Sequence, residues 1–152
     1  MNQVVASPSR IFGACPAGYC VGDEVLIDGT IVRATKGPIC YVALSAFTCQ
    51  VGQIQRGERV TNHLSCPGCG SDLEHDNRVV FVLSNVQTRD LSVKYSAYNW
   101  ARIDGRATEA SERYCALSWE LTQAGKYAEA EQAIEEATKR LKPTPQIAGF
   151  SP

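Results

Sequence analysis

A pair of cysteines in a tight turn is the feature that most constrains how this chain can fold. Cys66 and Cys69 are separated only by Pro67 and Gly68, within the segment 64–73. Proline presets one backbone dihedral of a turn and glycine tolerates a positive φ, so both thiols can point toward one metal ion. Zinc-ribbon knuckles supply half of a tetrahedral site in this way. The sequence therefore predicts a metal half-site, and the alternative is a tight turn that holds two free thiols.

Further candidate ligands lie earlier in the chain. Cys15 and Cys20 enclose Pro16 and Gly18, which again favour a turn. Cys40 stands at the expected start of a helix, where the helix dipole favours a negatively charged thiolate. These three cysteines are therefore added to the two of the knuckle.

The spacings leave two sets of four ligands open. Two turn-borne pairs, typical of a structural zinc site, would be formed by Cys15, Cys20, Cys66 and Cys69. A set that combines turns with a helix start would be formed by Cys15, Cys40, Cys66 and Cys69. This second set would also suit an iron–sulfur cluster. Zinc and a cluster both bind thiolates at similar spacings, so the sequence does not separate them.

The remaining histidines and cysteines are expected to have structural or solvated roles. His63 and His75 flank the knuckle, and we expect both to be solvated loop residues rather than ligands. Cys49 is expected to be a small buried hydrophobic residue. Cys115 lies far along the chain from the other six cysteines, and we expect it to pack rather than to bind metal.

Charge and hydropathy narrow the classes of partner. The chain of 152 residues has a net charge of −1 and a pI of about 6.1, which gives no general electrostatic basis for binding nucleic acid. The basic residues near the knuckle are Arg56, Arg59 and Arg78. The segment 1–10 is polar and no apolar run approaches membrane-spanning length. With seven cysteines at short spacings, these features predict a cytoplasmic protein in a reducing compartment and no membrane contact.

The order of the local patterns predicts an α+β fold. We expect a small antiparallel sheet with one helix and a cysteine metal knuckle, followed by a C-terminal helical hairpin. Strand signals lie at 3–5 or 10–12, at 25–27 and 30–33 around an Asp28-Gly29 turn, and at 79–86. A buried helix is expected from Cys40 onward. The segment 53–62 is polar, and the aromatic-rich segment 91–103 is predicted to form a further strand.

From Asp104 the composition changes to one typical of helices. The first predicted apolar stripe consists of Ala110, Tyr114, Leu117 and Leu121, and the second of Ala130, Ala133, Ile134, Ala137 and Leu141. Gly125 separates the two helices, and Asp104 or Thr108 is expected to cap the first. The predicted organisation is therefore a metal-binding domain at 1–103, the hairpin at 104–142 and a tail at 143–152.

The hairpin resembles a single tetratricopeptide unit. The matching positions are Tyr114, Leu117, Leu121, Gly125, Tyr127, Ala130 and Ala137, with Ser118 in place of the usual Gly or Ala. One such unit does not bury its own face, so the resemblance implies that a second copy, a larger protein or the N-terminal domain covers it. Trp119 lies off the stripe and is a candidate interface anchor.

The segment 15–86 is similar to an uncharacterised family of short prokaryotic proteins. The matching residues are Cys15-Pro16-Ala17-Gly18, Val21-Gly22-Asp23, Asp28-Gly29, Cys40, Cys66-Pro67 and the run 79–83. Tyr19 stands where that pattern often has His, and Cys20 and Cys69 are additions to it. The resemblance implies a shared set of cysteines and no established activity.

These observations favour a non-catalytic metal-binding protein. Zinc would hold the N-terminal domain, and the hairpin would bind a second copy or a larger protein. The sequence contains no Gly-rich phosphate loop, HExxH motif or GxSxG motif, which weakens the case for an enzyme. Two alternatives are an iron–sulfur redox subunit of an oxidoreductase complex and a zinc-ribbon protein that binds nucleic acid.

Overall fold

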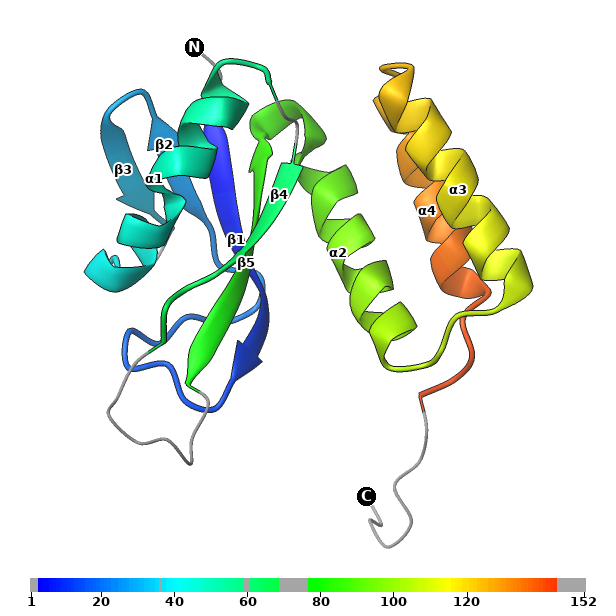
Figure 1. The fold of residues 1–152 in the computed structure, drawn as a ribbon, viewed down its shortest axis with the longest axis horizontal. Helices are drawn as coiled ribbons and strands as arrows, with labels where there is room; N and C mark the ends of the chain where they lie inside the picture. Colours follow the sequence, from blue (N-terminus) through cyan, green and yellow to red (C-terminus); the bar gives the residue numbers. More distant parts are fainter. Residues whose placement is uncertain (1–2, 36, 59–60, 69–76, 145–152) are drawn as a thin grey trace, which may run out of the picture. The chain divides into compact units, whose positions relative to one another are not determined.

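The structure is a computed structural model that describes residues 3–35, 37–58, 61–68 and 77–144. Its described part contains a five-stranded antiparallel sheet and four α-helices, so the expected α+β class is confirmed (Figure 1). The chain divides into two compact units, Met1–Val93 and Lys94–Pro152. The division falls inside a helix, ten residues before the boundary at 103 that the composition suggested.

The sheet belongs to the N-terminal unit and has the strand order β3-β2-β1-β5-β4. Every neighbouring pair is antiparallel. The strands are β1 (Val4–Phe12), β2 (Val25–Asp28), β3 (Ile31–Ala34), β4 (Thr61–Ser65) and β5 (Arg78–Asn85). The predicted hairpin is confirmed, since β2 and β3 pair across a turn in which Gly29 has a φ of 63°. β1 spans both of the places where a strand was expected.

One of the two edge strands of the sheet, β4, was not expected from the sequence. It begins at Thr61, near the end of the segment 53–62, which the composition describes only as polar. Its register is fixed by β5, with Leu64 opposite Phe81 and Ser65 opposite Val80. Edge strands are often polar because one side of the strand lacks a partner, which weakens the local signal.

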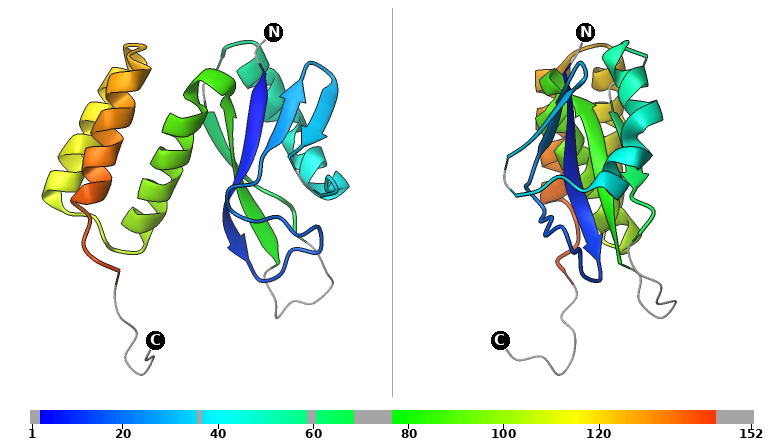
Figure 2. Two further views of the ribbon diagram at one scale, coloured as in Figure 1. Left: turned by 180° about the vertical axis from the view of Figure 1, so that it is seen from behind. Right: turned by 90° about the vertical axis from the view of Figure 1, so that its left-hand side faces the viewer.

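One helix, α1 (Tyr41–Gln55), packs on one face of the sheet (Figure 2). Its start was predicted correctly, since Cys40 is the N-cap residue. The Phe47 ring meets the Phe81 ring of β5 edge to face, with centroids 4.9 Å apart. The core between the helix and the sheet is formed by Val4, Ala6, Tyr19, Val25, Ile27, Ala43, Phe47, Ile54, Val79, Phe81 and Leu83.

The prediction of a strand at 91–103 is wrong, because this segment forms helix α2 (Arg89–Ile103). The signals that start and end the helix lie outside the aromatic run. Asn85 accepts a hydrogen bond from the Thr88 N–H in the preceding 3-10 turn (Val86–Thr88), and Gly105 follows the helix with a φ of 79°. The alternation of aromatic residues favoured a strand, but tertiary packing overrides such propensities.

The predicted hairpin is confirmed as α3 (Glu109–Gln123) and α4 (Tyr127–Lys139). Thr108 caps α3, accepting a hydrogen bond from the Ser111 N–H, while the Ser111 hydroxyl accepts one from the Thr108 N–H. Gly125, with a φ of 75°, forms the turn. The buried face of α4 is the predicted one, but α3 buries Ser111, Cys115, Ser118 and Thr122 rather than the predicted apolar stripe.

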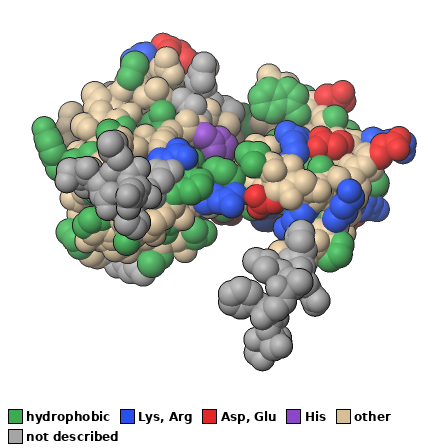
Figure 3. Space-filling view, turned by 60° about the horizontal axis from the view of Figure 1, so that its bottom comes forward, with side chains coloured by type: hydrophobic (Ala, Val, Ile, Leu, Met, Phe, Trp, Pro, Cys, Tyr) green, Lys and Arg blue, Asp and Glu red, His purple; other side chains and the backbone are tan. Residues whose placement is uncertain are grey.

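None of the helices in the described segments is both long and apolar enough to cross a bilayer. Acidic and basic side chains are interspersed over the C-terminal unit on the face drawn in Figure 3.

Two aromatic residues of α1 provide a matched test of this core. Phe47 is 2% exposed and Tyr41 is 83% exposed. Phe47→Ala should lower the free energy of unfolding by about 3–5 kcal/mol, because it removes a buried ring and leaves a cavity. Tyr41→Ala should change it by less than about 1 kcal/mol. Urea titrations followed by circular dichroism measure both, and equal effects would contradict the described packing of α1.

Candidate functional site

Three cysteines from distant segments line one small hollow in the N-terminal unit. Cys15 lies in the loop after β1, Cys40 at the N-cap of α1, and Cys66 directly after β4. The hollow has a volume of about 10 Å³. Its other lining residues are Pro16, Tyr19, Val42, Ala43, Asn77, Arg78, Val79 and Phe81. The fold therefore places three thiols around one hollow, although each follows the previous one by about 25 residues in the sequence.

The Cys66 sulfur accepts a hydrogen bond that a backbone carbonyl oxygen normally accepts between two paired strands. The Cys66 N–H donates to the Val79 carbonyl at 2.9 Å, which continues the pairing of β4 with β5. The Val79 N–H, however, donates to the Cys66 sulfur at 3.2 Å rather than to a carbonyl oxygen. This contact fixes the position of the Cys66 sulfur at the end of β4.

The turn after Cys66 has the geometry that its sequence predicted. Gly68 has a φ of 97°, in the region that glycine tolerates best. A Cβ at this position would also lie 3.3 Å from the Asn77 carbonyl oxygen, so the turn packs closely against the start of β5. The Asn77 side chain accepts a hydrogen bond from the Ala14 N–H at 3.0 Å. Asn77 thereby connects the segment before Cys15 to the turn after Cys66.

Tyr19 connects the other two cysteines. Its hydroxyl accepts a hydrogen bond from the Cys40 N–H at 3.0 Å. Its ring is buried and meets the Phe81 ring edge to face, with centroids 5.4 Å apart. Burial raises the pKa of Tyr19, and the nearby Cys40 and Cys15 thiols add to the rise. Tyr19 therefore remains a neutral phenol that holds the start of α1 beside the Cys15 loop.

The hollow has room for about one water-sized particle. This is the scale of a single ion. As they stand, the described His, Cys, Asp and Glu side chains form no group of three or more that would hold a metal. Metal binding would therefore require the cysteine side chains to rearrange from the described positions.

The other predicted candidates are placed differently. Cys20 is exposed, its thiol donates to the Gly18 carbonyl at 3.6 Å, and it does not line the hollow. Cys69 and His75 lie outside the described residues. His63 is on β4 and does not line the hollow. The expectation that Cys49 is buried is wrong, because α1 presents it to solvent.

Two residues of this site were missed from the sequence. In the sequence, Tyr19 is only a departure from the His that is frequent at this place in the similar family. Its position between Cys15 and Cys20 is the signal that puts it beside any ligand on that turn. Asn77 had no sequence signal, since its contacts join segments more than 60 residues apart. The Val79 N–H is likewise a backbone donor that only the β4–β5 register reveals.

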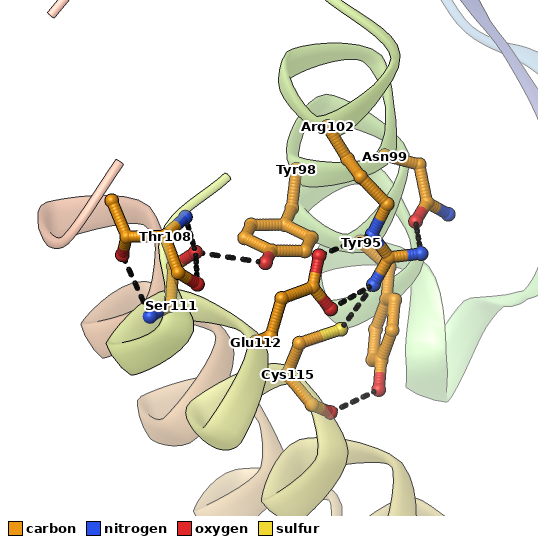
Figure 4. Close-up of polar contacts among 8 residues, drawn as sticks. All are labelled: Tyr95, Tyr98, Asn99, Arg102, Thr108, Ser111, Glu112 and Cys115. Atoms are coloured by element: carbon orange, nitrogen blue, oxygen red, sulfur yellow. Dashed lines mark hydrogen bonds and ion pairs between the residues drawn. The ribbon is translucent and has the colours of Figure 1, made fainter. Parts of the chain in front are cut away.

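A second polar cluster joins α2 to α3 in the C-terminal unit (Figure 4). The Arg102 guanidinium donates to both carboxylate oxygens of Glu112, at 2.8 and 3.0 Å, and to the Cys115 sulfur at 3.2 Å. The Tyr95 hydroxyl donates to the Cys115 carbonyl at 3.0 Å, and the Tyr98 and Ser111 hydroxyls are 3.1 Å apart. Residues 95, 98 and 102 are spaced to share one face of a helix. Their spacing is the signal that identifies 91–103 as helical.

This cluster stabilises the packing of α2 on α3 and does not activate the Cys115 thiol for a reaction. Burial raises the pKa of the Cys115 thiol, despite the neighbouring Arg102 guanidinium. A thiol with a raised pKa is neutral at physiological pH and is a poor nucleophile or ligand. Lys94 also forms ion pairs with Glu131 and Glu135 of α4. The part of α2 from Lys94 onward therefore makes several polar contacts with the hairpin, beside the ring contact of Tyr95 with Trp119.

Comparison with known proteins identifies no relative. No protein-family model, no curated protein and no solved structure matches this chain. The two resemblances drawn from its motifs therefore stay predictions.

The Tyr95 phenol makes the C-terminal unit sensitive to alkali. Burial raises the pKa of Tyr95 from 10.0 to about 12. The folded state favours the protonated phenol, so its contribution is complete below about pH 10 and is lost as the pH rises toward 12. Thermal melts across this range should show a steeper loss of stability for wild type than for Tyr95→Phe. Tyr41→Phe, on an exposed side chain, is the control, and equal slopes in all three proteins would contradict the assignment.

Proposed function

We propose that the N-terminal unit is a structural zinc-binding module in which Cys15, Cys40 and Cys66 are ligands. The observation that carries this proposal is the convergence of these thiols on one hollow from three segments of the chain. The fourth ligand is Cys69, on the basis of its spacing from Cys66 alone, since it lies outside the described residues. The ligand set is therefore the one that contains Cys40 rather than Cys20.

Three features of the hollow favour zinc. Thiolates are the ligands that structural zinc prefers, and zinc accepts four of them without a demand for a particular d-electron geometry. The hollow has room for about one water-sized particle, which is the scale of a single ion. The N–H donor on the Cys66 sulfur is a second-sphere contact of the kind that stabilises a metal-bound thiolate.

The metal would act by cross-linking segments that the sheet does not join. It would tie the Cys15 loop and the start of α1 to the end of β4. Cross-links that close long loops restrict the unfolded chain most, so an ion at this point stabilises the whole unit. The function proposed for the whole chain is accordingly that of a non-catalytic accessory subunit, which binds its partner through the C-terminal helices.

Single cysteine substitutions test the ligand set. Cys15→Ser, Cys40→Ser and Cys66→Ser should each abolish binding of about one zinc ion per chain. Each should also lower the stability of the N-terminal unit by several kcal/mol, on the scale of structural zinc. Metal analysis of anaerobically purified protein, with an absorbance spectrum, measures the first effect and thermal melts the second. Strong visible absorbance would indicate an iron–sulfur cluster in place of zinc.

Matched controls separate metal loss from general damage. Cys49→Ser, on the same helix as Cys40, and Cys20→Ser, on the same turn as Cys15, should retain the metal. Cys115→Ala should also retain it and cost at most about 1 kcal/mol in packing. Wild-type protein without metal, or loss of metal in Cys20→Ser but not in Cys40→Ser, would overturn the proposed site.

A further inference from the structure

An apolar stripe with an exposed leucine at its centre runs along α3 beside the buried face of this helix. The outer stripe consists of Ala110, Tyr114, Leu117, Leu121 and Ala124, at intervals of four, three, four and three residues. Leu117 is 43% exposed, Ala110 and Ala124 are exposed, and the other two are half-buried. Alternating steps of four and three residues are the spacing of a helix–helix seam.

The buried face of α3 does not include this stripe. On its buried side, α3 places Ser118 against α4, where the Ser118 hydroxyl donates to the Ala130 carbonyl at 2.7 Å. Within the stripe Tyr114 also contacts the end of α4, since the Arg140 guanidinium lies 4.3 Å from the centre of its ring. Leu117, at the middle of the stripe, remains exposed and is free for a different contact.

Two opposite charges border the outer stripe on the side away from α4. Ser118 marks the α4 side of Leu117, and successive residues of a helix are about 100° apart. By this spacing Arg113 and Glu120 fall on the other border of the stripe. Both are exposed, and the ion pair that Arg113 makes with Glu109 lies on the surface, where such pairs contribute little.

We propose that the outer stripe is an interface between two copies of this chain, with the two α3 helices antiparallel about a two-fold axis near Leu117. In this arrangement Leu117 packs near its own counterpart, and residues on the same border of the two helices face each other. Arg113 of each copy then meets Glu120 of the other, which gives two equivalent ion pairs. A parallel arrangement would instead bring opposite borders of the two helices together, so Arg113 and Glu120 would not meet. The self-complementary border is the reason to choose a second copy over another protein.

Charge exchange tests both the occupant and the orientation. Wild-type protein, with its full chain, should sediment as a dimer at high micromolar concentration. Arg113→Glu and Glu120→Arg should each weaken dimerisation by about tenfold, because two attractive pairs become repulsive. The double variant R113E/E120R restores opposite charges and should recover most of the wild-type affinity. In the double variant the introduced carboxylate at position 113 still lies one turn from Glu109 of the same helix. Recovery would therefore come from the contact between the two copies and not from a pair within one helix.

Two further variants distinguish the stripe from other apolar positions. Leu117→Asp should weaken dimerisation by more than about a hundredfold, because it buries a carboxylate in the seam. Trp119→Ala is the matched control: Trp119 is 53% exposed but lies on the other side of α3, where its ring meets the Tyr95 ring. Circular dichroism melts should show that every variant still folds.

Three outcomes would overturn the proposal. They are a wild type that stays monomeric and binds a different protein, a dimer that Trp119→Ala disrupts as strongly as Leu117→Asp does, and a double variant that shows no recovery. None of these outcomes bears on the zinc site, which lies in the N-terminal unit.

Discussion

The edge-to-face contacts of Phe81 with Tyr19 and Phe47 determine where the cysteines of the N-terminal unit lie. Phe81 is fully buried on β5, a strand with partners on both sides. Tyr19 brings the Cys15 loop to this ring, and Phe47 brings α1, whose N-cap is Cys40. The register of β4 on β5 then places Cys66 one step beyond Ser65. The hollow between the thiols is therefore a consequence of apolar packing rather than of the cysteines themselves.

The secondary-structure elements of the two units are held together by different kinds of interaction. In the N-terminal unit an aromatic core sets the geometry, and polar contacts such as that of Asn77 with Ala14 adjust the loops. In the C-terminal unit helix α2 is attached to the hairpin by hydroxyls, a guanidinium and carboxylates. Such contacts are directional, and each depends on its partner remaining in the correct protonation state. The alkaline sensitivity expected for Tyr95 follows from this design.

The sequence was most informative where one local signal decided the structure. The Asp28-Gly29 turn and the start of α1 at Cys40 depend on neighbouring residues and were predicted correctly, and Thr108 was one of the two candidates for the cap of α3. Helix α2 was mistaken for a strand because its aromatic residues alternate, while the Asn85 cap of the 3-10 turn that leads into α2 lies outside the run. The shared hollow could not be derived, since Cys15, Cys40 and Cys66 meet only through the sheet register. Sequence spacing restricted the ligand candidates to five, and tertiary structure brought three of these together.

The difference between predicted and observed burial on α3 has a physical explanation. Periodicity identifies an apolar face, but it does not say which neighbour will cover that face. In α3 the apolar stripe and the buried face are adjacent and about one residue out of phase. The small side chain of Ser118 lies against α4 and that of Ser111 meets Tyr98 of α2, so the buried face of α3 is made of small residues while the larger Leu117 lies outside it. The proposed dimer would use the second face of α3, which the buried contacts do not occupy.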